Sequence, residues 1–368
     1  MSKVMNEKII PVLKQIKPLD QEAMNRTKER LDSLTKPRGS LGRMEALAVQ
    51  LAGITGDFFP VNSRKKVIVM AADHGVVKEG VSAYPQEVTL QMIANFVNGG
   101  AAINVLARQA KAELKIVDIG VIEDVNLPGV IGAKIRCGTG NFVREEAMSR
   151  LQAEEAIAVG ISIAKEAVGS GVKLLATGEM GIGNTAASSA VMAALTGYEP
   201  LLVVGRGTGL NDQQLKHKVE VVKKALAVHK PDPQDPVGVL SKVGGLEIAG
   251  LSGLILGAAA ERCPIIIDGF ISTVAALVAI KIAPLAAAYI IPSHLSQESG
   301  HALLLNYLEL IPYINLEMRL GEGTGAVLAM HLVEASARIL REMATFAEAG
   351  VSGREKVKER CASAVKKY

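Results

Sequence analysis

Residues 173–190 read KLLATGEMGIGNTAASSA, and the change of pattern within them decides the fold. The run KLLATGE (173–179) is short, largely apolar and bounded by glycine, which predicts a strand covered on both faces. A turn with Gly181 and Gly183 follows and leads through Asn184 and Thr185 into a helical pattern. A strand, a turn and a helix in this order are the repeating unit of α/β folds.

The same pattern recurs from residue 66 to about residue 330. Five more runs predict strands: KVIVMAA (66–72), LKIVDIG (114–120), LLVVG (201–205), PIIID (264–268) and AAYIIP (287–292). Longer helical patterns lie between these runs. The alternation predicts an α/β fold with a doubly wound, mostly parallel sheet and helices on both faces.

The two ends of the chain read differently. QEAMNRTKERLDSL (21–34) and RMEALAVQLAGI (43–54) predict helices with no strand between them, and the charged C-terminal tail is helical as well. We therefore expect a small helical subdomain built from residues 1–60 with 335–368. Residues 61–334 would form the large α/β catalytic domain.

Composition excludes several classes of protein. Aromatic residues make up 3% of the 368 residues, Trp is absent, and the net charge of +4 is spread thinly, so nucleic-acid binding is not expected. The three cysteines, Cys137, Cys263 and Cys361, lie far apart and predict neither a disulfide framework nor a zinc site. The N-terminal stretch has no continuous apolar core, which argues against a signal peptide and favours a cytoplasmic protein.

One apolar region resembles a membrane span. Residues 264–292 are apolar, but Asp268, Lys281 and Pro284 divide them into pieces shorter than the roughly 20 residues that a span needs. The division predicts a strand, a helix and a strand inside a protein core, and no membrane association.

Polar turns follow the predicted strands. They read DHG, GEMGIGNT, GRGTG, DGF and PSHLS, and a further turn, GEGTG, comes near residue 322. The carboxyl ends of parallel strands meet at one edge of a sheet, where ligands bind. Turns of this kind on one edge predict an active-site crevice.

Two of these turns are suited to anions. GEMGIGNTAASSA (178–190) and VGRGTGLNDQQLKHK (204–218) both place glycine N–H groups ahead of a helix, although neither is a Walker A or dinucleotide motif. Together they indicate a phosphorylated substrate, with Lys218 able to reach the phosphate as a point charge. The alternative is an ordinary pair of turns and a solvated lysine.

Histidines and serines give weaker signals. Asp73–His74 and His294 lie at strand ends, but the remaining histidines lack ligand spacing, so hydrogen-bonding roles are favoured over a metal. No GxSxG motif is present, which argues against serine hydrolysis. In GVSAYPQEVTLQM (80–92), Ser82, Tyr84 and Gln91 would line a flat aromatic pocket, unless the segment is only a loop before a helix.

MRLGEGTGAVLAM (318–330) places one carboxylate, Glu322, between two glycines ahead of a helical run. Without neighbouring side chains, a ligand can approach both the carboxylate and the backbone. Thr324 is expected to cap the helix. The alternative is a surface turn with a solvated glutamate.

Seven motifs occur in order between residues 34 and 326: LTKPRGSLGRMEALA, AADHGVVKEGVSAYPQEVT, GEMGIGNTAASS, VGRGTG, DGF, PSHLSQE and MRLGEGTGA. Together they resemble the nicotinate-nucleotide–dimethylbenzimidazole phosphoribosyltransferases, a family of cobalamin nucleotide-loop assembly. Ala186 departs from the pattern, since a second hydroxyl often follows Thr185 there.

The resemblance implies a pentosyltransferase that moves phosphoribose from nicotinate mononucleotide to 5,6-dimethylbenzimidazole. Its products would be nicotinate and α-ribazole 5′-phosphate, with inversion at the anomeric carbon. It also implies a homodimer, a small helical domain from both chain ends, and no metal or organic cofactor.

The resemblance further implies a role for each site residue, with Glu322 as the general base between Gly321 and Gly323. The base pocket would consist of Ser82, Tyr84, Gln91, Met180 and Leu320. The phosphate would be held by Gly181, Gly183, Gly205, Gly207 and Lys218, and Asn184 and Thr185 would also bind the substrate. Glu179 and Asp268 would meet the ribose or position its neighbours, and Ser293 or Ser296 would contact nicotinate.

A single carboxylate suffices for this chemistry. The pyridinium nitrogen of nicotinate mononucleotide leaves as a neutral ring, so no general acid is required, in contrast to the paired carboxylates of glycoside hydrolysis. The incoming base only has to lose its second N–H proton, and burial should raise the pKa of Glu322 towards neutrality for that task. Alternatives are the same chemistry on adenine or a phenol, or a nucleotide-binding subunit without turnover.

Overall fold

The computed structural model describes residues 7–60, 63–207 and 209–352. Contacts divide these residues into a large unit, 7–18 with 63–331, and a small unit, 19–60 with 332–352. The tail predicted to be helical beyond residue 352, with Cys361, lies outside the described residues.

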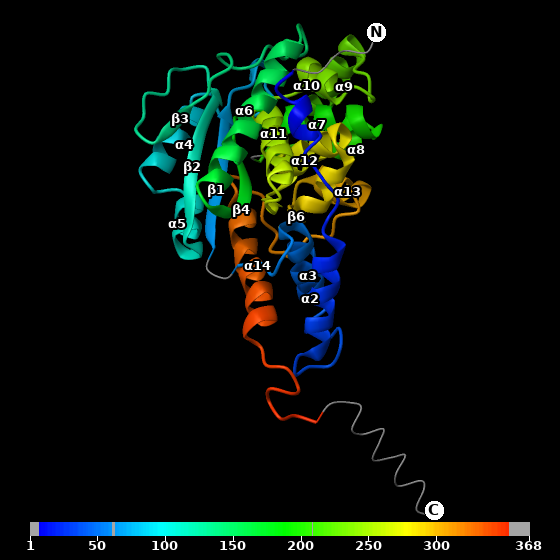
Figure 1. Cartoon of the computed structure of the whole chain (residues 1–368). Coiled ribbons are helices and arrows are strands. Elements are labelled where there is room, and N and C mark those ends of the chain that lie inside the picture. Colours follow the sequence, from blue (N-terminus) through cyan, green and yellow to red (C-terminus); the bar gives the residue numbers. More distant parts are fainter. Residues whose placement is uncertain (1–6, 61–62, 208, 353–368) are drawn as a thin grey trace, which may run out of the picture. The chain divides into compact units, whose positions relative to one another are not determined.

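One six-stranded parallel sheet forms the centre of the large unit, in the order β3-β2-β1-β4-β5-β6 (Figure 1). The strands are β1 (Arg64–Ala72), β2 (Ala112–Gly120), β3 (Val130–Gly132), β4 (Val172–Met180), β5 (Ile265–Ile267) and β6 (Ile290–Pro292). The strand order reverses between β1 and β4, so the topological switch point lies at their carboxyl ends. The predicted doubly wound sheet is confirmed.

One predicted strand is wrong and one strand was missed. LLVVG (201–205) begins within the short helix α8 (Pro200–Val203), where Pro200 occupies the first turn and its fixed φ suits a helix start. Leu201 and Leu202 are 69% and 51% exposed, so their apolar run does not mark a core. The missed strand, β3, has only three residues and follows Pro128–Gly129, which reads as a turn.

The helices of the large unit are α1 (Ile10–Leu13), α4 (Val88–Val97), α5 (Ala102–Ala110), α6 (Arg150–Gly169), α7 (Asn184–Thr196), α8, α9 (Asp212–His229), α10 (Pro236–Val243), α11 (Leu246–Ala260), α12 (Phe270–Ile282), α13 (Ser299–Tyr307) and the start of α14 (Thr324–Glu342), with the 3₁₀ helices η1 (Gly75–Glu79) and η2 (Pro284–Tyr289). Helices α4, α5, α6, α11 and α12 pack directly against the strands. A Cβ at Gly250 of α11 would lie 2.5 Å from Met70 Sδ, and one at Gly323 would lie 2.9 Å from Val67 Cγ2. Met70 and Val67 are three residues apart on β1 and point to opposite faces of the sheet. Helix α11 and the turn before α14 therefore pack against opposite faces.

The apolar region 264–292 contains β5, α12, η2 and β6, as predicted, with both strands and most of α12 buried. Among the described residues, a different stretch, Val88–Ala110, has the length and hydropathy of a membrane span. The structure divides it into α4 and α5.

The small unit contains α2 (Gln21–Ser33), α3 (Arg43–Thr55) and the C-terminal part of α14. Its core joins both chain ends: Leu31, Leu34, Ala48, Val49 and Leu340 pack together. Asp20 caps α2 by accepting a hydrogen bond from the Ala23 N–H at 2.9 Å.

The predicted start of the small unit, residue 1, needs correction. Ile9 and Ile16 are buried, and the Tyr289 hydroxyl donates a hydrogen bond to the Lys17 carbonyl at 2.7 Å. Residues 7–18 therefore belong to the large unit. That the small unit behaves as a separate domain stays a prediction.

Candidate active site

A cavity of about 430 Å³ opens at the switch point, beside Glu179 and Met180 at the carboxyl end of β4. Eleven of the predicted site residues line it: Tyr84, Glu179, Met180, Gly181, Asn184, Thr185, Gly207, Ser296, Leu320, Gly321 and Glu322. They come from turns far apart in the sequence. The crevice expected from the polar turns is therefore present.

Glu322 sits in the cavity wall in a conformation that few residues adopt. Its φ is +62°, and the flanking Gly321 and Gly323 have φ of +82° and +91°. A non-glycine residue in this region is uncommon and carries strain, which concentrates at functional sites. The residue is 6% exposed, so the alternative of a solvated surface glutamate is wrong.

The carboxylate of Glu322 is only partly satisfied by the protein. Its Oε2 is buried and has no hydrogen-bond partner in the described part of the chain. Burial raises the pKa of Glu322 to about 7, and the nearby Asp268 carboxylate contributes to this rise by repulsion. The predicted shift towards neutrality agrees with this value.

Glu179 supports the loop of Glu322. Its Oε2 accepts a hydrogen bond from Asn184 Nδ2, and its carboxylate also accepts one from the Glu322 backbone N–H. A Cβ at position 321 would collide with Glu179 Oε1, so only glycine fits there. Burial, followed by repulsion from Asp268 and Glu247, raises the pKa of Glu179 to about 8.

Asp268 lies behind the cavity rather than in its wall. Its two carboxylate oxygens accept hydrogen bonds from the Gly323 and Ala326 N–H groups, each at 3.0 Å. Asp268 thus caps α14, whereas Thr324, the predicted cap, donates its hydroxyl to the Gly321 carbonyl. Of the two roles predicted for Asp268, contact with ribose or positioning of its neighbours, this arrangement supports positioning, because both oxygens accept hydrogen bonds from backbone donors.

Ser293 and Gly323 are also outside the cavity lining. The Ser293 hydroxyl donates to the Asp268 carbonyl at 3.3 Å and lies 3.0 Å from His294 Nδ1. It is fully buried, so Ser296 is the serine of this turn that a ligand can reach.

Ser82 and Gln91 do not line the cavity either. The Ser82 hydroxyl accepts a hydrogen bond from the Tyr84 N–H at 3.1 Å and so shapes the loop. Gln91 points outward from α4, while Val88 and Met92, four residues apart on its inner face, line the cavity.

Lys218 is fully buried beneath the second glycine-rich turn. Its Nζ donates hydrogen bonds to Thr185 Oγ1 at 2.7 Å and to the Gly205 carbonyl at 3.2 Å. Burial lowers its pKa to about 8, and the nearby Glu298 carboxylate opposes that shift. The alternative of a solvated lysine is wrong. Gly183 and Gly205 shape the turns without lining the cavity.

Sequence reasoning missed eight lining residues: Val88, Met92, Ile182, Gly269, Phe270, Ile271, Glu298 and Arg319. The spacing of Val88 and Met92 could have identified the inner face of their helix. Glu298 lies in the PSHLSQE motif, directly after a strand-end turn, which is the sequence signal for its place in the site. Burial raises its pKa, while Lys218, Arg319 and the Gly207 N–H oppose that effect.

Within the described residues, no group of three or more His, Cys, Asp or Glu side chains could hold a metal ion. His74 Nε2 lies 2.8 Å from Glu247 Oε1, and both side chains are fully buried. His294 contacts Ser293. The hydrogen-bonding roles predicted for these histidines are confirmed.

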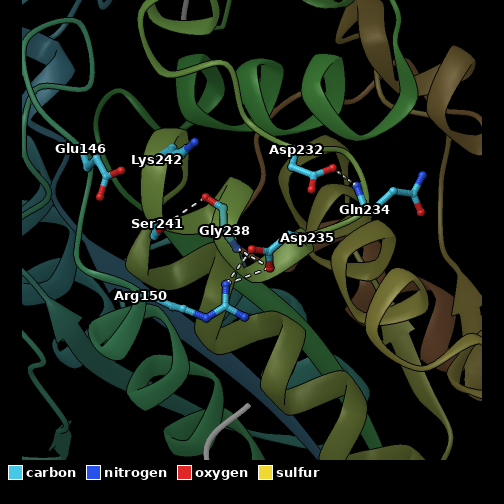
Figure 2. Close-up of a pocket in the computed structure, with 8 residues that line it drawn as sticks. All are labelled: Glu146, Arg150, Asp232, Gln234, Asp235, Gly238, Ser241 and Lys242. Carbon is cyan, nitrogen blue, oxygen red and sulfur yellow. Dashed lines mark hydrogen bonds and ion pairs between the residues drawn. The ribbon is translucent and has the colours of Figure 1, made fainter. Parts of the chain in front are cut away.

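A second cavity, of about 420 Å³, lies at the N-terminal ends of α6 and α10 (Figure 2). Figure 2 shows the Arg150 guanidinium facing the Asp235 carboxylate, and Arg150 Nη1 lies 2.8 Å from both carboxylate oxygens. Arg150 Nε also contacts Glu154 at 3.1 Å, and Lys242 Nζ donates to the His229 carbonyl at 2.8 Å. Arg150, Asp235 and Lys242 of this cavity therefore have partners within the protein.

Sequence and structure comparisons define the class of protein. Residues 16–351 match the model of a phosphoribosyltransferase family, and the chain belongs to that family. Two similar relatives are the nicotinate-nucleotide–dimethylbenzimidazole phosphoribosyltransferases of Chloroflexus aggregans, 57% identical over 92% of this chain and 96% of that one, and of Halalkalibacterium halodurans, 52% identical over 94% and 97%. The crystal structure of CobT from Thermus thermophilus is similar with a TM-score of 0.86 and 46% identity, over 90% of this chain and 99% of that one.

Proposed function

We propose that this chain transfers phosphoribose from nicotinate mononucleotide to 5,6-dimethylbenzimidazole, releasing nicotinate and forming α-ribazole 5′-phosphate. The names of its relatives support these substrates. One observation carries the proposal. Glu322 lines the cavity at the switch point, and its buried Oε2 has no hydrogen-bond donor among the described residues.

In the reaction, the bond between the anomeric carbon and the nicotinate nitrogen breaks, and its electron pair neutralises the pyridinium. The leaving ring needs no proton, and a nitrogen of the incoming base forms the new bond from the opposite side, which inverts the anomeric carbon. The base would become cationic unless its other nitrogen loses a proton. Glu322 Oε2 is the acceptor for that proton, with an effect of roughly 100- to 10,000-fold on rate.

The pKa of Glu322 suits this role. At a value of about 7, a substantial fraction of the carboxylate is ionised at neutral pH, yet it remains a stronger base than an ordinary glutamate. Asp268 and Glu179 act through it, since both hold the backbone of its loop.

The cavity provides surfaces for each part of the two substrates. The flat acceptor would lie against the apolar side chains of Tyr84, Val88, Met92, Met180 and Leu320. The phosphate would meet Thr185 and the Gly207 turn, where the buried Lys218 supplies positive charge. Nicotinate would contact Ser296. The resemblance further supports a cytoplasmic homodimer.

An acceptor screen tests the proposal. Purified protein is incubated with nicotinate mononucleotide and, separately, with dimethylbenzimidazole, adenine and phenol, while nicotinate release and product mass are measured. We expect the nucleotide of dimethylbenzimidazole to form fastest. Release with adenine or phenol alone would assign a different acceptor, and no release with any of them would contradict a transferase role.

A further inference from the structure

The three glutamates in the cavity wall differ in the partners of their carboxylate oxygens. Glu179 accepts hydrogen bonds from the Asn184 side chain and the Glu322 N–H. Glu322 and Glu298 each have a buried Oε2 without a partner among the described residues. Because a buried acceptor is almost always hydrogen-bonded, these two oxygens are the places where a ligand donor is missing.

Glu298 is held in the cavity wall with its Oε2 packed against Gly205, where an added Cβ would collide with that oxygen. The Gly207 N–H donates to its carboxylate, and since Oε2 has no partner in the described part of the chain, this bond goes to the other oxygen. Its backbone is fixed as well, because its N–H donates to Ser296 Oγ at 3.3 Å and its carbonyl accepts from the His301 N–H at 2.9 Å. The residue is only 9% exposed.

The two substrates offer few donors to a carboxylate. The phosphate and the nicotinate carboxylate of the donor nucleotide only accept hydrogen bonds, and its pyridinium nitrogen carries no hydrogen. What remains are the two ribose hydroxyls and the N–H of the acceptor base, which the proposed function assigns to Glu322. The unpartnered oxygen of Glu298 therefore matches a ribose hydroxyl.

We infer that Glu298 Oε2 accepts a hydrogen bond from a ribose hydroxyl of the donor nucleotide and thereby selects ribose over deoxyribose. This inference rests on the proposed function. Glu298 would thus make the contact with ribose that was one of the roles expected of Glu179 and Asp268. The carboxylates of those two residues already accept hydrogen bonds from Asn184 and from the backbone of the Glu322 loop.

A competing explanation places the Glu298 carboxylate within the phosphate-binding site, because it contacts the Gly207 turn near Lys218. A carboxylate there would repel the phosphate, so its removal would tighten binding of the donor. A ribose acceptor predicts the opposite sign. The two explanations are therefore separated by one set of variants.

The test compares nicotinate mononucleotide with its 2′-deoxy and 3′-deoxy analogues at saturating dimethylbenzimidazole, in the wild type, Glu298→Ala and Glu298→Gln. We expect the wild type to favour the ribose donor over one analogue by at least about 100-fold in kcat/KM, because the analogue leaves a buried carboxylate unpaired. In Glu298→Ala the ratio should fall to within about threefold, and Glu298→Gln, which keeps an acceptor oxygen, should lie between. Glu322→Gln is the matched control: it should slow all donors equally and leave the ratio unchanged.

Three outcomes would overturn the inference: no discrimination by the wild type, an unchanged ratio in folded Glu298→Ala, or tighter donor binding by that variant. Thermal unfolding of both Glu298 variants checks their folding. Failure of the proposed function looks different, because the wild type would then release no nicotinate even from the ribose donor, and the inference would fail with it.

Discussion

The large unit contains two cavities of nearly equal volume, about 430 and 420 Å³, which differ in whether their charged side chains have partners within the protein. In the cavity of Figure 2, Arg150 and Asp235 satisfy each other at 2.8 Å. In the cavity at the switch point, Glu322 and Glu298 each leave a buried oxygen unpartnered among the described residues. The size of a cavity therefore says little about function, whereas unsatisfied polar atoms on residues that line a cavity indicate where a ligand binds.

The largest expected effect separates the two cavities by activity. Glu322→Gln keeps the shape of the side chain but cannot accept the proton, so we expect kcat to fall roughly 100- to 10,000-fold with little change in donor binding. Asp235→Ala, in the other cavity, should leave kcat within about twofold. Steady-state nicotinate release measures both, and near-full turnover by Glu322→Gln would contradict its role as the base.

The same two variants should affect stability with opposite signs. The native pKa of Glu322, about 7, exceeds its ordinary value of 4.5, so the folded protein binds this proton more tightly than the unfolded chain does. The free energy of unfolding therefore falls as the pH rises from 4.5 to 7, and the loss remains above pH 7. Glu322→Gln removes this loss, and we expect it to be more stable at pH 8 by about 2 kcal/mol, after allowing for screening by water.

Asp235→Ala should instead be less stable by about 2 kcal/mol at pH 8. It removes the partner of Arg150 and also the cap of α10, where Asp235 accepts from the Gly238 N–H at 3.0 Å. Denaturant unfolding at pH 8 and pH 4 measures both variants. If Glu322→Gln were destabilised at pH 8, its carboxylate would have a stabilising partner and the contrast would not hold.

The pH profile gives a smaller effect. Because the base must be ionised, kcat/KM should rise with pH through an apparent pKa of about 7, the value for Glu322 in the free protein. Asp268 raises that pKa by repulsion, so Asp268→Asn should move the rise to lower pH while also weakening the cap of α14. Profiles of kcat/KM for both proteins test this, and an unmoved rise would show that Asp268 acts only on the backbone.

How well the sequence predicts the role of a site residue depends on how far along the chain its partners lie. Turns such as GEMGIGNT follow strands directly, and local rules were enough to place Glu179, Asn184 and Thr185 at one edge of the sheet. The prediction of a strand at 201–205 was wrong because a short apolar run alone cannot show whether a segment pairs with the sheet or forms a short helix. The alternation of strands and helices therefore predicted the fold, but neither the edge strand β3 nor the helix α8.

Residues that act across the chain were harder to predict. Asp268 caps α14 from 55 and 58 residues away, so the nearer hydroxyl of Thr324 was the natural but incorrect choice. Likewise, the buried Lys218 donates hydrogen bonds to Thr185 and to the Gly205 carbonyl, which lie 33 and 13 residues away in the sequence. Glu298 follows a strand-end turn, but the local sequence cannot show that one of its carboxylate oxygens is buried without a partner among the described residues.

The smallest effect tests which side chains of α4 contact the acceptor base. Met92 lines the cavity and Gln91 points outward, one position along α4. Met92→Ala should raise the KM for dimethylbenzimidazole about tenfold, because it removes apolar contact with a flat base. Gln91→Ala should change it by less than about twofold. Acceptor titrations at saturating donor measure both values. The reverse order would return Gln91 to the base pocket and mean that α4 turns when the acceptor binds.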